Sequence, residues 1–324
     1  MPALNAALWI RQALDSVVGQ TYSELEIILI DDGSTDATTD IIAEYAARDA
    51  RVRAVYHSST WGRGASRNEG LTLATGEWVS FVDADDWQAL DRYARMLACA
   101  AGADLVFCNV ANYFGPHRPL SPVFHFPAVL SRDYCFRSLG TLCSRLVRTA
   151  LIREHGLRFP DVRETGIQFE DVYFHYLGVA HAQQIAFVDE CLYTHRRHPA
   201  SVTGIFSENP ELHFDCFRTW DELARVAPPG LLCHYLHVFR HYLPQVDSSY
   251  VFYRRVKAVL AESGLRREDV PAHLRGDFDF FRRFPWWTVL RAKLFAVKLG
   301  PQQGRVRLVF LGRKVLDYSF GPKT

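Results

Sequence analysis

Residues 25–36 have the sequence LEIILIDDGSTD, in which an apolar run ends in two acids and a turn. An apolar run of this length is typical of a buried parallel strand, and the glycine with its polar neighbours indicates a turn. Residues 78–87, WVSFVDADDW, repeat the pattern of a strand followed by acids. Because parallel sheets bind ligands at the carboxyl ends of their strands, we expect both acidic segments to lie at one site.

Strand and helix patterns alternate on either side of these segments, which predicts an α/β fold with parallel crossovers. The predicted strands are 25–31, 52–56, 78–82, 104–110 and 185–193; the predicted helices are 6–18, capped by Asn5, 36–48, 64–74, 88–100 and 144–155. From about residue 207 the pattern is mostly helical, with helices expected at 231–261 and 287–299. This change of pattern suggests a domain boundary near residue 205, which divides the chain into residues 1–205 and 206–324.

Composition excludes several classes of protein. Hydrophobic residues make up 48% of the 324 residues and charged residues 23%, as in globular proteins. The net charge of +1 argues against a nucleic-acid partner. That charge is unevenly spread: residues 1–251 hold 21 Lys and Arg against 30 Asp and Glu, and residues 252–324 hold 16 against 6.

The seven cysteines form no CxxC pair and no signal-peptide pattern opens the chain, so we expect reduced thiols and a cytoplasmic location. No run of 18 uncharged apolar residues occurs, and the sequence therefore predicts no membrane span.

The acids at the two strand ends suggest a binding site. Asp31 and Asp32 can accept hydrogen bonds from a base or a sugar. The alternative is a structural role for this segment: an Asx turn and a helix cap at Ser34 or Thr35, with Asp36 in the first turn of the helix. Asp83, Asp85 and Asp86 repel one another unless a cation or a hydrogen-bonded ligand holds them, and oxygen ligands favour Mg²⁺ or Mn²⁺. The alternative there is a solvated acidic loop.

Two later segments carry weaker signals. Glu170 and Asp171 interrupt an apolar stretch, where one of them can act as a general base or both can complement a helix N-terminus. Residues 193–203, YTHRRHPASVT, offer His195 and His198 as metal ligands, or Arg196, Arg197 and the histidines as partners of a diphosphate. A solvated basic loop is the alternative for this segment.

In their order along the chain, these segments resemble the family 2 glycosyltransferases of the GT-A fold. The resemblance covers about residues 2–204, and residues after it resemble no family. The matching segments are 2–5 (PALN), 20–22 (QTY), 26–36 (EIILIDDGSTD), 62–70 (GRGASRNEG), 74–77 (ATGE), 79–87 (VSFVDADDW), 143–148 with 159–160, 170–171 and 198–203.

The resemblance implies an α/β GT-A domain, Rossmann-like, with a mostly helical C-terminal region. It implies transfer of a sugar, with inversion, from a nucleotide-sugar donor to a glycan or lipid-linked acceptor, with Mn²⁺ or Mg²⁺ as cofactor. The resemblance implies that Asp32 contacts the base, with support from Asp31, and that Arg67 positions the nucleotide. It implies that Asp85 binds the cation and that Asp83 contacts the ribose or the cation. It also implies that Asp171, beside Glu170, is the general base and that Arg197 and His198 contact the diphosphate or the acceptor.

The beginning of the chain departs from the family pattern. The family's first strand ends at the position of Met1-Pro2, so we expect that strand to be missing, and Leu4 stands where an aromatic residue often stacks on the base. Two explanations are open: Met1 is an internal methionine of a longer native sequence, or nucleotide binding is impaired. The second favours a catalytically silent nucleotide-binding or scaffold subunit of a glycan-assembly complex.

Residues 281–299, FFRRFPWWTVLRAKLFAVK, combine aromatic and basic residues. Helical spacing would place Trp286, Leu290, Leu294 and Val297 on one face. A basic amphipathic helix of this kind can bind an anionic membrane surface, which would make the protein peripheral at the inner face of the cytoplasmic membrane. The alternative is a helix packed on the catalytic domain.

Overall fold

The computed structural model describes residues 1–122, 135, 142–167, 169–198 and 201, scattered residues between 219 and 279, and three strands beyond residue 295. The chain divides into two compact units. The first contains Met1–Glu208 and Asp215–Ala227, and the second contains Asn209–Phe214 and Pro228–Thr324.

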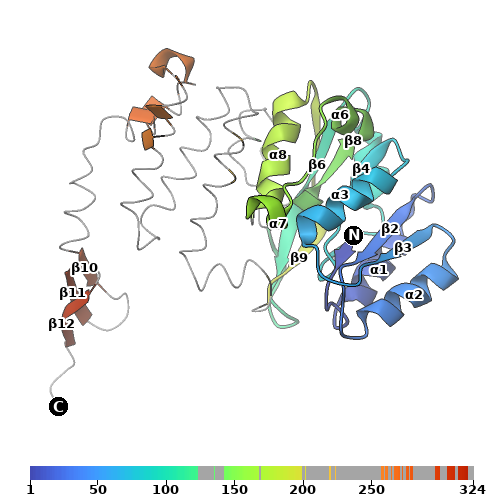
Figure 1. The fold of residues 1–324 in the computed structure, drawn as a ribbon, viewed down its shortest axis with the longest axis horizontal. Coiled ribbons are helices and arrows are strands. Elements are labelled where there is room, and N and C mark those ends of the chain that lie inside the picture. Colours follow the sequence, from blue (N-terminus) through green and yellow to red (C-terminus); the bar gives the residue numbers. More distant parts are fainter. Residues whose placement is uncertain are drawn as a thin grey trace. The chain divides into compact units, whose positions relative to one another are not determined.

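The first unit begins with a parallel sheet of three strands in the order β1-β2-β3. Its strands are β1 (Pro2–Ala3), β2 (Ile27–Asp31) and β3 (Val52–Tyr56), and the helices that connect them are α1 (Ile10–Val18) and α2 (Thr38–Arg48). Helix α2 packs on β2 and β3 (Figure 1). Three of the apolar residues of β2, Ile27, Leu29 and Ile30, are buried, as the sequence predicts for a strand covered on both faces, whereas Ile28 is half-buried.

The predicted caps of α1 and α2 are wrong. Helix α1 begins at Ile10, and its N-cap residue makes no side-chain cap bond. Asn5 instead joins two loops, because its Oδ1 accepts a hydrogen bond from the Thr35 backbone N at 2.8 Å. Helix α2 begins at Thr38, and the Oδ1 atom of Asp36 accepts from the Thr38 backbone N at 2.9 Å.

A second, mixed sheet has the strand order β4-β8-β6-β9-β5, with β7 paired to β6. Only β6 and β9 are parallel among its described pairs. Its strands are β4 (Trp78–Ser80), β5 (Trp87–Gln88), β6 (Leu105–Tyr113), β7 (Ser121–Pro122), β8 (Arg145–Arg148) and β9 (Ile185–Arg196). The helices of this part are α3 (Arg63–Leu73), α4 (Arg92–Ala98), α6 (Thr149–Glu154), α7 (Val162–Thr165) and α8 (Glu170–His181), with a 3-10 turn η1 (Leu142–Ser144).

The helix predicted at 144–155 is partly wrong, because Arg145–Arg148 form strand β8. This strand lies between β4 and β6 and pairs with both, while Leu146 and Val147 are buried. Tertiary pairing on two edges outweighs the weak helical pattern of so short a segment. The helix that remains, α6, begins at Thr149.

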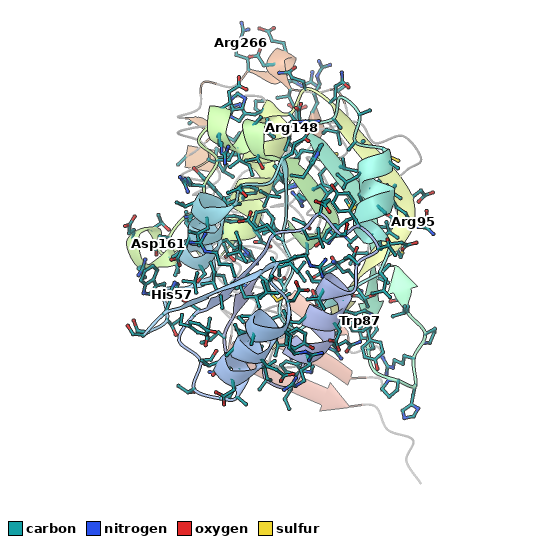
Figure 2. The ribbon with its side chains drawn as sticks, turned by 90° about the vertical axis from the view of Figure 1, so that its right-hand side faces the viewer. His57, Trp87, Arg95, Arg148, Asp161 and Arg266 are labelled. Atoms are coloured by element: carbon teal, nitrogen blue, oxygen red, sulfur yellow. The ribbon has the colours of Figure 1, made fainter. Side chains whose placement is uncertain are left out.

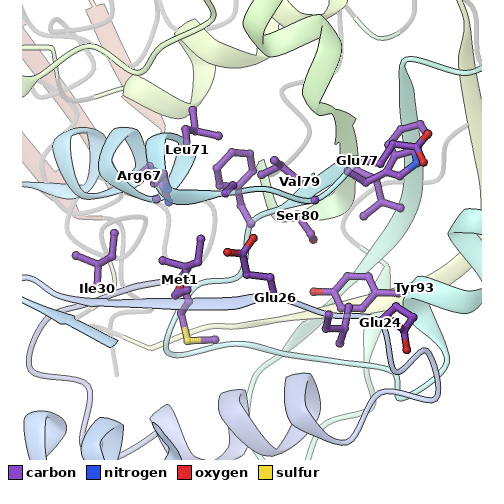
Figure 3. Close-up of a pocket in the computed structure, with 18 of the residues that line it drawn as sticks. Met1, Glu24, Glu26, Ile30, Arg67, Leu71, Glu77, Val79, Ser80 and Tyr93 are labelled. Carbon is purple, nitrogen blue, oxygen red and sulfur yellow. The ribbon is translucent and has the colours of Figure 1, made fainter. Parts of the chain in front are cut away.

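A cavity of about 380 Å³ lies between the two sheets (Figure 3). Ile28 and Ile30 of β2 line one wall, Val79 and Ser80 of β4 line the other, and Arg67 of α3 is among the lining residues. The first strand, expected to be missing, is represented by the two residues of β1, which pair with Ile30 and Asp31. Beyond them, the cavity continues between β2 and β4.

The second unit contains a three-stranded antiparallel sheet, β10 (Ala296–Leu299), β11 (Arg305–Phe310) and β12 (Arg313–Ser319), and a 3-10 turn η5 (Arg267–Asp269). The helix predicted at 287–299 is therefore wrong at its end, where Val297 lies in a strand. Alternating residues such as RVRLV and the glycines between the strands favour hairpins. Residues 281–295 and most of 231–261 lie outside the described residues. Among the residues described, no helix is long and apolar enough to cross a membrane.

Candidate active site

A cavity of about 610 Å³ lies at the carboxyl ends of β1 and β2, where the start of α3 and the acidic loop after β4 meet. Five of the residues to which the family resemblance assigns a role line it: Asp32, Asp83, Asp85, Glu170 and His198. Four others with such a role are not among its lining residues: Asp31, Arg67, Asp171 and Arg197. The structure thus separates the residues facing the cavity from those behind it.

Asp31 and Asp32 have different surroundings. The carboxylate of Asp31 accepts hydrogen bonds from the Ser34 backbone N at 3.0 Å and from the Thr39 hydroxyl at 2.5 Å, which makes the local turn. Asp32 is buried and faces the cavity, and its carboxylate accepts from the backbone N atoms of Trp61 and Gly62, both at 2.9 Å. Asp31 therefore has the turn role considered as an alternative, and Asp32 is available to a ligand.

The acidic loop after β4 divides in the same way. Asp83 and Asp85 line the cavity, whereas Asp86 is buried. The Asp86 carboxylate accepts from the Tyr193 hydroxyl and from the Arg196 backbone N, both at 2.8 Å. Burial raises the pKa of Asp86, and the charges of Asp83 and Asp85 raise it further. Asp86 thus ties the loop to β9 while the other two acids face the cavity.

Arg67 of α3 links two acidic parts of the site. Its Nη1 atom donates to Glu170 Oε1 at 2.6 Å and its Nη2 atom donates to Asp83 Oδ1 at 2.9 Å. The Arg67 and Glu170 side chains are 3% and 5% exposed, so the contact between them is shielded from water, whereas the Asp83 side chain is 40% exposed. A buried guanidinium with two carboxylate partners fixes both of them, which is a positioning role.

Glu170 and Asp171 open α8, but only Glu170 lines the cavity. Burial raises the pKa of Glu170, even though the guanidinium groups of Arg63 and Arg67 face it and oppose the shift. The Oδ1 atom of Asp171 accepts from the Val172 backbone N at 2.9 Å, within its own helix turn. The two acids thus stand in different environments at the start of one helix.

The basic segment at the end of β9 brings both histidines to the cavity. His198 Nε2 lies 2.9 Å from Asp85 Oδ2, and its ring lies against Trp9, with ring centres 4.2 Å apart. His195 also lines the cavity. Arg197 turns to Asn112, whose Oδ1 accepts from its Nε at 2.7 Å, and Arg196 Nε donates to the Asp85 backbone O at 2.7 Å.

Two glycines bring backbone close to the site. Gly62 has φ of +92°, a conformation that L side chains rarely adopt, and its N–H points at Asp32. A Cβ at Gly64 would lie 2.3 Å from the Pro160 backbone O. Both glycines belong to the segment 62–70 that carries the family resemblance, so the sequence contained the signal.

Sequence reasoning missed several lining residues, among them Trp9, Thr60, Val162 and Ile167. None of these carries a charge, and none belongs to a pattern with a chemical meaning of its own. Their position follows from tertiary packing and had no signal in the sequence.

Within the described part of the chain, no three His, Cys, Asp or Glu side chains gather into a metal-binding group. Asp85 shares one carboxylate oxygen with His198, and Asp83 shares one with Arg67. Mg²⁺ is commonly bound by one or two carboxylates together with substrate phosphates. The two carboxylates therefore fit a cation site that a bound diphosphate completes.

Comparison with known proteins gives a family match over part of the chain. Residues 1–151, just under half of the chain, match the model described as "Glycosyl transferase family 2". The recognition made from the sequence motifs is thereby confirmed, and these motifs lie in the strands and loops that form the cavity.

Three similar proteins put the match in context. The chain is 34% identical over 207 residues to "Putative glycosyltransferase EpsH" of Bacillus subtilis, covering 61% of this chain and 60% of that protein, so it matches well under two thirds of this relative's length. The S. aureus TarS 1–349 structure in complex with UDP superposes with a TM-score of 0.67 at 18% identity, covering 95% of each chain. The mannosyltransferase PcManGT from Pyrobaculum calidifontis, in complex with GDP-Man and Mn²⁺, gives 0.54 at 19%, covering 90% of this chain and 82% of that one. These superpositions confirm the predicted GT-A fold class.

Proposed function

We propose that this protein transfers a sugar, with inversion, from a nucleotide-sugar donor to a hydroxyl acceptor in a metal-dependent reaction. The observation that carries the proposal is one cavity lined by Asp32 at the end of β2, Asp83 and Asp85 after β4, and Glu170 at the start of α8. In this proposal Asp32 would meet the base, Asp83 and Asp85 would bind the cation, and Glu170 marks the end of α8 at which Asp171 lies.

The donor would lie along the floor of this cavity. Asp32 would accept a hydrogen bond from the base, and Asp83 would reach the ribose or the cation. Asp85 would hold Mg²⁺ or Mn²⁺, which would neutralise the charge that develops on the departing diphosphate. The TarS structure contains UDP, and the PcManGT structure contains GDP-Man and Mn²⁺, which supports a donor of this class. His198, beside Asp85, would contact the diphosphate, and Arg197 would support the same segment.

Inversion needs a base on the face of the sugar opposite the leaving group. The pair Glu170-Asp171 would supply it, with Asp171 as the group that takes the acceptor proton and Glu170 as the carboxylate that Arg67 holds in place. Single displacement with one such carboxylate follows the logic of inverting glycosidases.

The proposal also includes the bounds of the catalytic domain, the acceptor and the location of the protein. We place the catalytic domain at about residues 1–205, because every lining residue of the cavity falls there. The acceptor would be a growing cell-surface polysaccharide or a lipid-linked glycan, which the B. subtilis putative teichuronic acid biosynthesis glycosyltransferase TuaG supports by analogy. The enzyme would work in the cytoplasm, with the basic segment 281–299 at an anionic membrane surface.

Titration of the protein with UDP and GDP, with and without Mn²⁺, tests the proposal, followed by a donor screen for nucleoside diphosphate release. We expect one nucleotide to bind with the cation and the Asp85→Ala variant to lose at least tenfold in that affinity. Asp40→Ala, which removes an exposed acid of α2, is the matched control and should bind as the native chain does.

The possible outcomes separate the rival functions. Binding followed by turnover supports the transferase. Binding without turnover of any nucleotide sugar would favour the catalytically silent subunit. Failure to bind any nucleoside diphosphate would reject the proposed donor class.

A further inference from the structure

His57 lies directly behind Asp32 and is not among the residues that line the cavity. Its Nδ1 atom lies 2.8 Å from Asp32 Oδ1, and its Nε2 atom lies 2.6 Å from Glu69 Oε2 of α3. The His57 side chain is 3% exposed, and its ring is stacked on Trp61 with ring centres 3.9 Å apart. Figure 2 labels His57 on the same side of the first unit as Asp161, which opens α7.

The geometry fixes the charge of this histidine. A carboxylate can only accept a hydrogen bond, so each ring nitrogen that faces one must carry a proton, and both protons make an imidazolium. Glu69 and Asp32 raise the pKa of His57, although burial opposes the shift. The other charged group near this cluster is Arg163 of α7, whose guanidinium lies 5.2 Å from the Trp61 ring centre. The cluster is a chain of Glu69, His57 and Asp32 with the cation in the middle.

The same contacts leave one hydrogen-bond acceptor position of the Asp32 carboxylate open to a ligand. Its Oδ1 atom is used twice, by His57 and by the Trp61 backbone N, and its Oδ2 atom is used once, by the Gly62 backbone N. A carboxylate has about four acceptor positions, so one remains, on Oδ2. Because three donors from two directions hold the carboxylate, the remaining position has a fixed direction.

We propose that His57 is a positioning residue for nucleotide recognition: it keeps the Asp32 carboxylate oriented, so that the free acceptor position of Oδ2 meets an N–H of the donor's base. Glu69 holds His57 from its other side. This inference rests on the proposed function, because it concerns the base end of that donor site. A group that acts only through Asp32 should affect donor binding and leave the transfer step, which takes place at the far end of the donor, unchanged.

The experiment measures UDP and GDP affinity of the full chain by calorimetry in Mg²⁺ between pH 6.5 and 8.5, together with steady-state kinetics. For His57→Gln, which keeps one hydrogen bond and loses the charge, we expect the dissociation constant and the donor KM to rise about tenfold or more, with kcat within about twofold. The native chain should lose affinity as the pH rises through the pKa of His57, and His57→Gln should show no such dependence. His155→Gln, at an exposed histidine, is the matched control.

Glu69→Gln provides a second test that does not touch Asp32. It removes one of the two acids that keep His57 protonated, so the loss of affinity should begin at a lower pH than in the native chain. This result remains decisive if His57→Gln does not fold.

Unchanged affinity in both variants overturns the inference while the proposed function stands. A fall in kcat with unchanged nucleotide affinity also overturns it, because a positioning residue at the base would not act in that way. If the native chain binds neither nucleotide, the proposed function itself fails, which is a different result from failure of the variants alone.

Discussion

Glu170 and Asp171 show how two identical charges acquire different tasks. The Glu170 side chain is 5% exposed and lies against Arg67, which is 3% exposed, whereas Asp171 is partly exposed and bonds within its own turn. Removing one member of a buried ion pair leaves the other charge unpaired, and that is far more costly than removing an exposed charge. The two acids should therefore separate stability from activity.

We predict that Glu170→Gln lowers the free energy of unfolding by about 3 kcal/mol, because Arg67 loses one of its two partners. Asp171→Asn should unfold within about 0.5 kcal/mol of the native chain but lose transfer activity by at least a hundredfold, because the acceptor proton has no base. Urea denaturation and initial rates measure both quantities. Near-normal turnover in Asp171→Asn would remove Asp171 from the mechanism.

The sequence predicts where the acids lie better than it predicts the surroundings of each acid. Asp32, Asp83 and Asp85 are expected at strand ends, and all three line the cavity. Asp31 makes the turn that the sequence offers as an alternative, whereas Asp86 accepts from Tyr193, which no local pattern connects to it. His57 could not be singled out, because its two partners lie 25 residues before it and 12 residues after it.

At the scale of elements, the start of α3 is held by backbone contact and not by a side-chain cap. Gly64 packs so closely on the segment after α6 that an added Cβ would lie 2.3 Å from the Pro160 backbone O. Gly178 in α8 is the contrasting case, since an added Cβ there would meet no atom of the described residues within 4 Å. One glycine is needed for a close approach, and the other weakens its helix.

We predict opposite effects for alanine at these two glycines. Gly64→Ala should destabilise the protein by about 1–3 kcal/mol and weaken nucleotide binding, because the start of α3 must move away from Pro160. Gly178→Ala should stabilise it by about 0.5–1 kcal/mol, since alanine restricts the unfolded chain and favours the helix. Thermal and urea unfolding of both variants give the comparison, and equal effects of the same sign would contradict the packing argument.

Elements with a strong local pattern were predicted well, and those that depend on distant partners were not. Strand β3 was predicted with its observed bounds, and β2 and α3 within two residues, because each has clear periodicity and clear ends. The local pattern predicts a helix where β8 forms, because the strands that pair with β8, β4 and β6, are distant in the sequence. The prediction of a helix at 287–299 is wrong at its end because β10 forms by pairing with β11, and a pattern within 287–299 alone does not show that pairing.

At the scale of the whole molecule, the near-zero net charge is the sum of an acidic stretch of sequence and a basic one. Residues 1–251 hold nine more acids than bases, and residues 252–324 hold ten more bases than acids. The cavity and its acidic loops belong to the first unit. An acidic catalytic part combined with a basic terminal part suits a protein whose donor arrives from solution and whose acceptor is held at an anionic surface.

We predict that the full chain sediments with vesicles containing anionic lipid and that a chain lacking residues 280–324 does not. Each Lys or Arg close to such a surface contributes about 1 kcal/mol, and segment 281–299 contains no acid to oppose its basic residues. Salt screens this attraction, so binding should weaken as the ionic strength rises from about 0.1 M to about 1 M. The Arg282→Gln, Arg283→Gln double variant should bind less than the native chain, and vesicles of neutral lipid serve as the control. Equal sedimentation of the full and shortened chains would show that this segment packs on protein and does not bind lipid.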